Sequence, residues 1–211
     1  MEHDGILVVI SGFAGAGKGT IVKGLLKDYD NYALSVSMTT RQPRPGEVNG
    51  EAYFFVSREE FEKTIEEGGL IEHAQYVDNY YGTPKAYVEE KLKAGMDVIL
   101  EIELQGALQI KKLYPEALLL FVTPPSAAIL KQRLTDRGTE TAEVIKKRMD
   151  RAAEESEMMD RYDHIIVNDK IEDCVAYTHS VIQAAHSAPG RLKKLTESLQ
   201  RDLRNMSEGK I

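Results

Sequence analysis

The 211-residue sequence predicts an α/β fold built on a mainly parallel sheet with helices on its faces. Short runs rich in Val, Ile and Leu alternate along the chain with longer segments of helical pattern, which is typical of repeated strand–helix–strand units. The runs are nearly continuous in apolar residues, as in strands buried on both faces of a parallel sheet. We expect core strands at residues 5–11, 97–102, 117–122 and 164–168, and a further one near 32–37.

The first strand leads directly into a glycine-rich turn, and a helical pattern over residues 21–27 follows. Glycines let backbone N–H groups point at an anion with no Cβ in the way. The helix adds its positive N-terminal end, and a lysine reaches the outer phosphates. This order of strand, loop and helix predicts a P-loop that binds a nucleoside triphosphate. The loop comprises Gly12, Phe13, Ala14, Gly15, Ala16, Gly17, Lys18, Gly19 and Thr20.

One position of this loop departs from the usual pattern. Gly19 stands where a Ser or Thr hydroxyl ordinarily ligates Mg²⁺, and Thr20 follows it. The departure concerns the direct contact between a hydroxyl and the metal, for which Thr20 is the remaining candidate. A glycine-rich turn without chemical consequence is the alternative interpretation, and the flanking strand and helix disfavour it.

Residues 35–94 differ from the rest and predict an inserted α+β lobe with its own small sheet. Strand-like segments at 52–56 and 70–76 lie on either side of a helix. Ser57 begins this helix with a capping-box pattern, and Gly68 follows its end.

The remaining segments are mainly helical. Thr83 and Pro84 predict the N-cap and first residue of a helix that ends near Gly95. A polar, arginine-bearing pair of helices at residues 126–162 is typical of a lid. The C-terminal segment, residues 191–211, predicts an amphipathic helix, which we expect to pack on its own domain rather than on another copy. We therefore expect a single domain of core (1–34, 95–125, 163–190), lobe (35–94), lid (126–162) and C-terminal helix (191–211).

Composition excludes several functions. The net charge of −7 disfavours nucleic-acid binding, because no long basic face offsets it. The lone Cys174 cannot form an intrachain disulfide, and the scattered histidines do not show zinc-ligand spacing. No apolar run is long enough for a membrane span, and the first residues do not resemble a secretion signal. We expect a cytoplasmic protein with small-molecule substrates, and a homo-oligomer stays open.

A second anion site is indicated by Arg41 and Arg44, three residues apart in a proline-stiffened loop. A solvated basic turn is the alternative for the arginines alone, since exposed arginines are common. The hydroxyls of Tyr53 and Tyr81 are further candidate donors to a phosphate.

Glu72 is a candidate for recognising a base. It lies in a run of mostly apolar and aromatic residues, where an unpaired carboxylate is costly. A carboxylate accepts two parallel N–H bonds, which matches N1–H and the exocyclic amine of guanine, and hydroxyls of Ser37 and Thr83 could donate to guanine O6. No Asn-Lys-x-Asp run is present, which disfavours a GTPase.

Several motifs together resemble the guanylate kinases over roughly residues 5–186, in the order found in that family. At Glu101 and Glu103 many relatives carry Asp. The resemblance implies a P-loop-type parallel sheet with an inserted GMP-binding lobe and a helical lid. The motifs are Gly12–Thr20, Ser37–Gly50, Asn79-Tyr80-Tyr81-Gly82-Thr83, Leu100–Gly106, Arg137-Gly138-Thr139-Glu140-Thr141 and Val167-Asn168-Asp169.

The same resemblance implies roles for individual residues. ATP is implied to contact the P-loop together with Arg133, Asn168 and Asp169, and Mg²⁺ to lie near Thr20 and Glu101. Catalytic positions are Lys18, Arg44, Arg137 and Arg148. Positions that contact GMP are Ser37, Arg41, Arg44, Tyr53, Glu72, Tyr81, Gly82, Thr83, Glu101 and Glu103.

The implied reaction is transfer of the ATP γ-phosphoryl group to GMP, which gives ADP and GDP. Two alternatives stay open at this point. Guanylate-kinase-like domains also occur as non-catalytic interaction modules, although those typically have a damaged ATP loop, whereas Lys18 and the loop glycines are intact here. A related kinase that acts on another monophosphate is the second alternative.

Overall fold

The structure is a computed structural model that describes residues 4–76, 78–136 and 141–208. A parallel sheet forms its centre, with strand order β2-β7-β1-β8-β9, and every pairing in it is parallel. The predicted parallel α/β core is therefore confirmed. The strands are β1 (Leu7–Gly12), β2 (Tyr32–Leu34), β7 (Asp97–Glu101), β8 (Leu118–Thr123) and β9 (His164–Val167).

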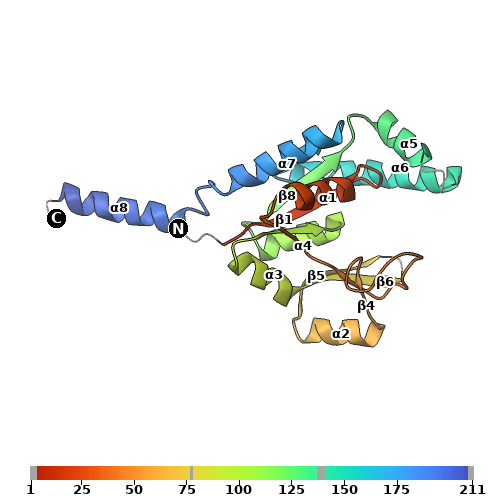
Figure 1. Ribbon diagram of the computed structural model, residues 1–211, viewed down its shortest axis with the longest axis horizontal. Coiled ribbons are helices and arrows are strands. Elements are labelled where there is room, and N and C mark those ends of the chain that lie inside the picture. The colour runs from red at the N-terminus through yellow and green to blue at the C-terminus, as the bar shows by residue number, and fades with distance from the viewer. Residues whose placement is uncertain (1–3, 77, 137–140, 209–211) are drawn as a thin grey trace.

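Helices cover both faces of this sheet (Figure 1). Helices α1 (Lys18–Asp28) and α7 (Ile171–Ala185) pack against each other on one side, while α3 (Lys85–Lys93) and α4 (Leu104–Leu113) lie on the other. Burial on both faces explains the apolar strands, since residues 7–11 of β1 are all buried. Aromatic edges extend this core, because the Phe121 ring contacts Phe13 at 4.9 Å and Tyr162 at 5.1 Å between centroids.

The segment predicted as an inserted lobe forms a second, mixed sheet of order β4-β3-β6-β5. Phe61 of α2 (Arg58–Glu66) is fully buried and stacks on Tyr80. The predicted cap of this helix is confirmed, because the Ser57 hydroxyl accepts a hydrogen bond from the Glu60 amide at 3.1 Å. The strands are β3 (Met38–Thr39), β4 (Phe54–Phe55), β5 (Leu70–Tyr76) and β6 (Asn79–Pro84).

The predicted start of α3 is wrong by one residue. Strand β6 continues to Pro84, which pairs with Leu70, and the helix begins at Lys85. Thr83 therefore belongs to the strand and does not cap the helix. Its hydroxyl donates instead to Glu72 on the neighbouring strand, because the two residues pair across the sheet.

The polar helical pair is present as α5 (Ala127–Asp136) and α6 (Ala142–Ser156), followed by the 3₁₀ turn η1 (Met159–Arg161). Thr141 caps α6 by accepting a hydrogen bond from the Val144 amide. Of the predicted connection between these helices, residues 137–140 lie outside the described part of the chain.

The C-terminal segment is helical as predicted, in α8 (Lys193–Ser207), but the expected packing on its own domain is wrong. The helix extends away from the body (Figure 1), and none of its residues is buried. The Arg191 guanidinium donates to the carbonyls of Asp4 and Gly5 at 2.6 and 3.0 Å, which holds the residues before the helix at the edge of the body. Among the described residues, no helix is long and apolar enough to cross a membrane.

We expect Phe121→Ala to lower the free energy of unfolding by about 3–5 kcal/mol, because it removes a fully buried ring and leaves a cavity between two other rings. Denaturant titration measures this change. Leu113→Ala is the control, since this side chain is 64% exposed and its loss should cost far less. Equal losses in the two variants would contradict the assignment of Phe121 to the core.

Candidate functional site

The loop after β1 has the backbone geometry that an anion cradle requires. Gly15 and Gly17 have φ angles of 89° and 94°, a region that disfavours side chains with a Cβ. The Lys18 ammonium donates to the carbonyls of Gly12 and Phe13 at 2.8 and 3.3 Å, so it arches back over the loop. Helix α1 begins at Lys18 and directs its N-terminal amides toward the same space.

Asn168 supports this loop from below. Its buried side-chain amide donates to the carbonyl of Ala16 at 2.8 Å, and a Cβ at Gly17 would collide with the same amide. The carbonyl of Asn168 in turn accepts a hydrogen bond from Arg133 of α5 at 2.9 Å. The family resemblance implied contact with a nucleotide for Asn168 and Arg133, and the structure adds a connection from α5 through Asn168 to the loop. Asp169, the next residue, is exposed.

Glu101 lies at the carboxyl end of β7, beside the first turn of α1. One of its carboxylate oxygens is 3.5 Å from where a Cβ on Gly19 would lie, so the carboxylate borders the P-loop at this glycine. Glu101 is exposed at one side, but the protein around its carboxylate removes part of the hydrating water, and this desolvation raises the pKa of Glu101. The positive charge of Lys18 opposes the shift. Thr20 lies exposed on the same turn.

These residues fit a magnesium ion. Carboxylate and hydroxyl oxygens are the ligands that Mg²⁺ prefers, and the ion is commonly held by one or two carboxylates together with substrate phosphates. The residues described in the structure contain no cluster of three or more groups that could hold a metal without a substrate. Glu101, with Thr20 nearby, therefore suits a metal that arrives with a nucleotide.

A buried carboxylate marks the second sheet. Glu72 on β5 is 6% exposed, and the hydroxyl of Thr83, itself fully buried, donates to it at 2.6 Å. Desolvation raises the pKa of Glu72, and the hydrogen bond from Thr83 opposes the shift. The other carboxylate oxygen would lie 2.7 Å from a Cβ on Gly106, so α4 approaches Glu72 closely only because this residue is a glycine. One hydroxyl does not satisfy a carboxylate, and the group retains capacity for further donors.

Arg41 is held in place by Glu47. The two side chains form a bidentate ion pair, with N–O distances of 2.9 and 3.0 Å. The second oxygen of Glu47 also accepts the backbone amide of Arg44 at 2.7 Å. These bonds lower the pKa of Glu47, with the hydrogen bond from Arg41 as the largest cause. A single carboxylate thereby shapes the turn that carries both arginines.

Aromatic rings flank this pair. The Arg41 guanidinium lies 5.4 Å from the centroid of the Tyr53 ring and 5.6 Å from that of Phe55. Tyr53 and Tyr81 meet edge to face at 6.0 Å. Burial is the main cause that raises the pKa of Tyr53, which keeps its hydroxyl protonated and able to donate.

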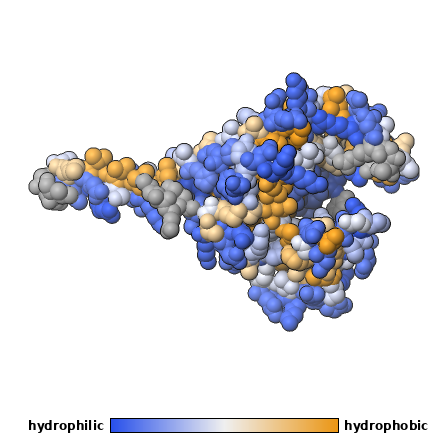
Figure 2. All heavy atoms as spheres, in the orientation of Figure 1, coloured by the Kyte–Doolittle hydropathy of each residue, from blue (hydrophilic) through white to orange (hydrophobic). Residues whose placement is uncertain are grey.

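Electrostatic interactions link Lys18 of the P-loop and Glu101 of β7 with Tyr53 beside Arg41. The negative charge of Glu101 contributes to the raised pKa of Tyr53, and the positive charge of Lys18 opposes the rise in the pKa of Glu101. The surface is hollowed between the α5–α6 pair and the lobe of the second sheet (Figure 2).

Helix α6 is linked to the central domain through Arg151. Its guanidinium donates to Glu103 at 2.8 Å and to Glu155 at 2.7 Å. Glu103 is the N-cap of α4, two residues after the end of β7, so the ion pair connects α6 to the core. Arg148, one turn earlier on α6, is partly exposed, and Arg137 lies outside the described residues.

The remaining predicted residues belong to the second sheet or its border. Ser37 precedes β3 and is partly exposed, and Gly82 is buried in β6 opposite His73. The structure thus places the predicted acceptor residues between Ser37 and Thr83 in the second sheet and the segments beside it, whereas Glu101 and Glu103 lie at the end of β7 and the start of α4.

Glu47 and Arg151 were not among the residues singled out from the sequence. The spacing of Glu47, six residues after Arg41 and three after Arg44, is a signal that could have identified it, since a turn closed by an ion pair needs an acid at such a distance. Nothing in the sequence distinguishes Arg151 from its basic neighbours, because its partner Glu103 is 48 residues away.

Comparison with known proteins agrees with this geometry. The guanylate kinase family profile matches residues 5–185. A guanylate kinase of Halalkalibacterium halodurans is 52% identical over 90% of this chain and 94% of its own length, and one of Oceanobacillus iheyensis is 47% identical over 96% and 98%. The crystal structure of guanylate kinase from Anaplasma phagocytophilum superposes with a TM-score of 0.75 at 32% identity, covering 93% of this chain and 96% of that one. The chain belongs to the guanylate kinase family.

Proposed function

We propose that this protein transfers the γ-phosphoryl group of ATP to GMP and releases ADP and GDP. One observation carries the proposal: the chain combines a buried carboxylate, Glu72, to which the hydroxyl of Thr83 donates, with an intact P-loop lysine, Lys18. The carboxylate suits the N1–H and amine of guanine, and the lysine suits a triphosphate. A non-catalytic module would have no need of the phosphate loop, and no feature of the described residues favours a different acceptor.

The donor side is formed by the P-loop, residues 12–20. Its amides and Lys18 hold the β- and γ-phosphates, with Asn168 beneath the loop and Arg133 and Asp169 toward the rest of the nucleotide. We propose Mg²⁺ as the metal, held by the phosphates with Glu101 and Thr20 as its protein neighbours. When bound, it neutralises charge on the phosphates.

The acceptor side is formed by the second sheet and the arginine turn. Arg41 and Arg44 bind the phosphate of GMP together with the hydroxyls of Tyr53 and Tyr81. The base lies at Glu72 and Thr83, with Ser37 and Gly82 beside them. Glu103 completes this side from the core.

The reaction is an in-line displacement. A phosphate oxygen of GMP forms a bond to the γ-phosphorus of ATP as the bond from this phosphorus to the β–γ bridging oxygen breaks, and ADP leaves. The attacking oxygen is already ionised, so no general base is needed. Arg44 and Lys18 align the two nucleotides, and Arg137 and Arg148 close with the lid onto the transferred group. Closure excludes water, which protects ATP from hydrolysis.

This mechanism requires parts that move relative to one another. We propose that residues 35–94 act as the GMP-binding lobe and residues 126–162 as the lid, on the core that carries the P-loop. Both substrates are nucleotides of central metabolism, and we place the reaction in the cytoplasm.

The activity is tested with purified protein, ATP, Mg²⁺ and one nucleoside monophosphate at a time, by following ADP release. GMP should be the fastest acceptor, and a preference for AMP would reject the proposed specificity. Lys18→Ala should reduce kcat at least thousandfold, since it removes the charge nearest the transferred phosphate. Lys112→Ala, on the exposed end of α4, is the control and should retain activity.

Asn168→Ala should raise the KM for ATP about tenfold and leave the KM for GMP unchanged, because one hydrogen bond that holds the P-loop is lost. Steady-state kinetics with each substrate varied in turn separates the two effects. Glu172→Ala, four residues along the chain and exposed, should change neither constant. An equal rise in both constants would show a general loss of structure instead.

Glu72→Gln should raise the KM for GMP roughly 30- to 150-fold, equivalent to about 2–3 kcal/mol, because a charged acceptor is lost and a donor meets the N–H groups of guanine. The KM for ATP should stay near its original value. Glu62→Gln is the matched control, since this glutamate is on the exposed face of α2. An unchanged KM for GMP in Glu72→Gln would remove this residue from the base site.

The same carboxylate predicts a pH dependence. Because burial raises the pKa of Glu72, protonation begins at a higher pH than for an ordinary glutamate. The KM for GMP should therefore rise as the pH falls through the raised pKa, and Glu72→Gln should flatten this rise. The folded protein also holds this proton more tightly than the unfolded chain, so the contribution of Glu72 to stability declines as the pH rises, and the variant should lose this dependence too.

A further inference from the structure

Arg151 and Glu103 are 48 residues apart in the chain, but their side chains meet between α6 and α4. The guanidinium of Arg151 donates through Nη2 to Oε2 of Glu103 at 2.8 Å and through Nε to Oε1 of Glu155 at 2.7 Å. Lys146 and Lys147 of the same helix pair with acids of α6 itself. Arg151 therefore joins two elements, and the proposed reaction gives it no role.

The main chain around Glu103 is held in place by its neighbours. The hydroxyl of Ser11, near the end of β1, donates to the carbonyl of Ile102 at 2.8 Å, and Glu103 is the N-cap of α4. A carboxylate at an N-cap can accept a hydrogen bond from the first amides of its own helix, but the side chain of Glu103 makes no such bond. The carboxylate is directed to Arg151 instead.

Arg151 lies on the end of α6 that is anchored to the core. The next residue, Ala152, is buried, and so is Tyr162, which follows η1. The side chain of Glu155 is 14% exposed, whereas that of Glu103 is 65% exposed. The ion pair with the less exposed acid fixes the guanidinium, and the guanidinium in turn fixes the exposed carboxylate of Glu103.

This contact uses one of the two oxygens of Glu103. A carboxylate accepts hydrogen bonds at both oxygens, so a donor on Oε2 leaves Oε1 for a ligand. The proposed function places Glu103 on the acceptor side, and a guanine base presents N–H donors. With Oε2 fixed, the side chain loses less conformational freedom when such a ligand binds.

We propose that Arg151 is a positioning residue for the acceptor nucleotide: it orients the carboxylate of Glu103 so that the second oxygen accepts a hydrogen bond from GMP. Glu155 orients Arg151 in the same way. The inference rests on the proposed function, since it concerns a contact with GMP. Exposed ion pairs contribute little to stability, so we expect Arg151 to act mainly on GMP binding and little on folding.

A direct attraction between the charge of Arg151 and the phosphate of GMP is the alternative explanation. The two explanations differ in sign at Glu155. If only charge mattered, removing the negative charge of Glu155 would strengthen the binding of an anion such as GMP. If Arg151 positions Glu103, the same change weakens binding, because the guanidinium loses the partner that fixes it.

Titration calorimetry with GMP in the absence of ATP tests the positioning role. Arg151→Gln should raise the dissociation constant for GMP about fivefold, because the carboxylate of Glu103 is no longer oriented. In steady-state kinetics, kcat and the KM for ATP should change less than about twofold, since Arg151 contacts neither the P-loop nor Lys18 in its printed bonds. This split separates positioning of the acceptor from a general loss of structure.

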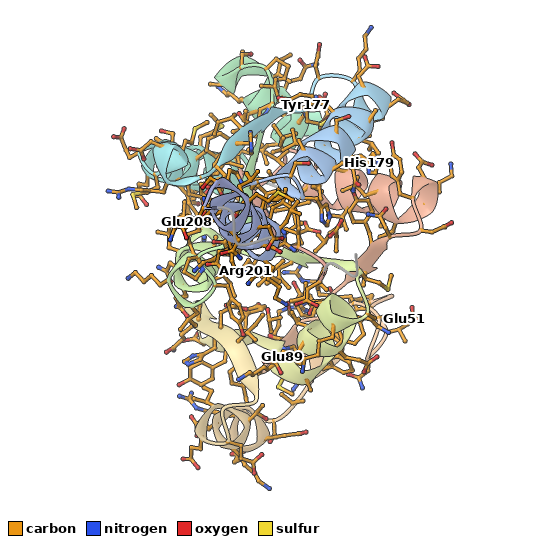
Figure 3. The ribbon with its side chains drawn as sticks, turned by 90° about the vertical axis from the view of Figure 1, so that its left-hand side faces the viewer. Glu51, Glu89, Tyr177, His179, Arg201 and Glu208 are labelled. Carbon is orange, nitrogen blue, oxygen red and sulfur yellow. The ribbon has the colours of Figure 1, made fainter. Side chains whose placement is uncertain are left out.

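Arg201→Gln is the matched control. Arg201 lies on α8, which extends from the body (Figures 1 and 3), and its side chain is 69% exposed and pairs with Asp202 of the same helix. This variant removes the same kind of side chain at a distance from Glu103, so the dissociation constant for GMP should stay at the wild-type value. Far-UV circular dichroism checks that both variants are folded.

Two further variants examine the chain of contacts. Glu155→Gln should weaken GMP binding about two- to threefold, opposite in sign to the effect of charge alone. Arg151→Lys should bind GMP with an intermediate affinity, because one ammonium group lacks the fork of N–H donors with which Arg151 reaches two acids.

A double-mutant cycle completes the test. Glu103→Gln should weaken GMP binding by itself, and adding Arg151→Gln should then change the dissociation constant less than about twofold, because the charged group that Arg151 orients is already gone. Effects that multiply in the double variant would overturn the inference. Tighter GMP binding by Glu155→Gln would also overturn it, as would unchanged binding by Arg151→Gln.

These outcomes are distinct from failure of the proposed function. Each of them can be observed in a wild-type protein that binds GMP and transfers phosphate to it, and each then rejects only the role of Arg151. A wild-type protein that neither binds GMP nor phosphorylates it would reject the proposed function, and the inference with it.

Discussion

The pairing of β1 between β7 and β8 is the constraint on which the rest of the site depends. All these strands run parallel, so their carboxyl ends reach the same edge of the sheet. The P-loop follows β1, Glu101 ends β7, and Asn168 follows β9 at the same edge. Groups that are more than 150 residues apart therefore meet, and the amide of Asn168 can support the carbonyl of Ala16.

The carboxylates of the site are kept in different states by their surroundings. Glu47 is ion-paired with Arg41, which lowers its pKa and makes it a permanent anchor for the turn. Glu72 is buried with one hydroxyl donor, which raises its pKa and leaves it short of partners. A group that is costly to bury in this way would gain most from a ligand with matching N–H donors, and for this reason we propose that Glu72 recognises guanine.

The chain combines regions with different packing requirements. The parallel core is buried on both faces, whereas the second sheet is small, is covered by α2, and contributes polar side chains to the site. Arg151 connects α6 to Glu103 at the start of α4, and Arg133 connects α5 to the backbone of Asn168. In the proposed mechanism, movement of α5 and α6 as a lid would act on the P-loop and on Glu103 through these contacts.

Local sequence determined the parallel strands, the P-loop, the Ser57 cap and the helical character of α8, because continuous apolar runs, glycines before a lysine and capping residues act over a few neighbouring positions. The motifs also pointed to the arginine turn and to Glu72. The tertiary structure alone decided the contacts between distant segments, such as the pairing of Arg151 with Glu103. It placed Thr83 in a strand rather than at a helix cap, since Pro84 pairs with Leu70. It also directed α8 away from the body. An amphipathic pattern predicts a helix with one apolar face, but it does not identify the surface against which that face packs.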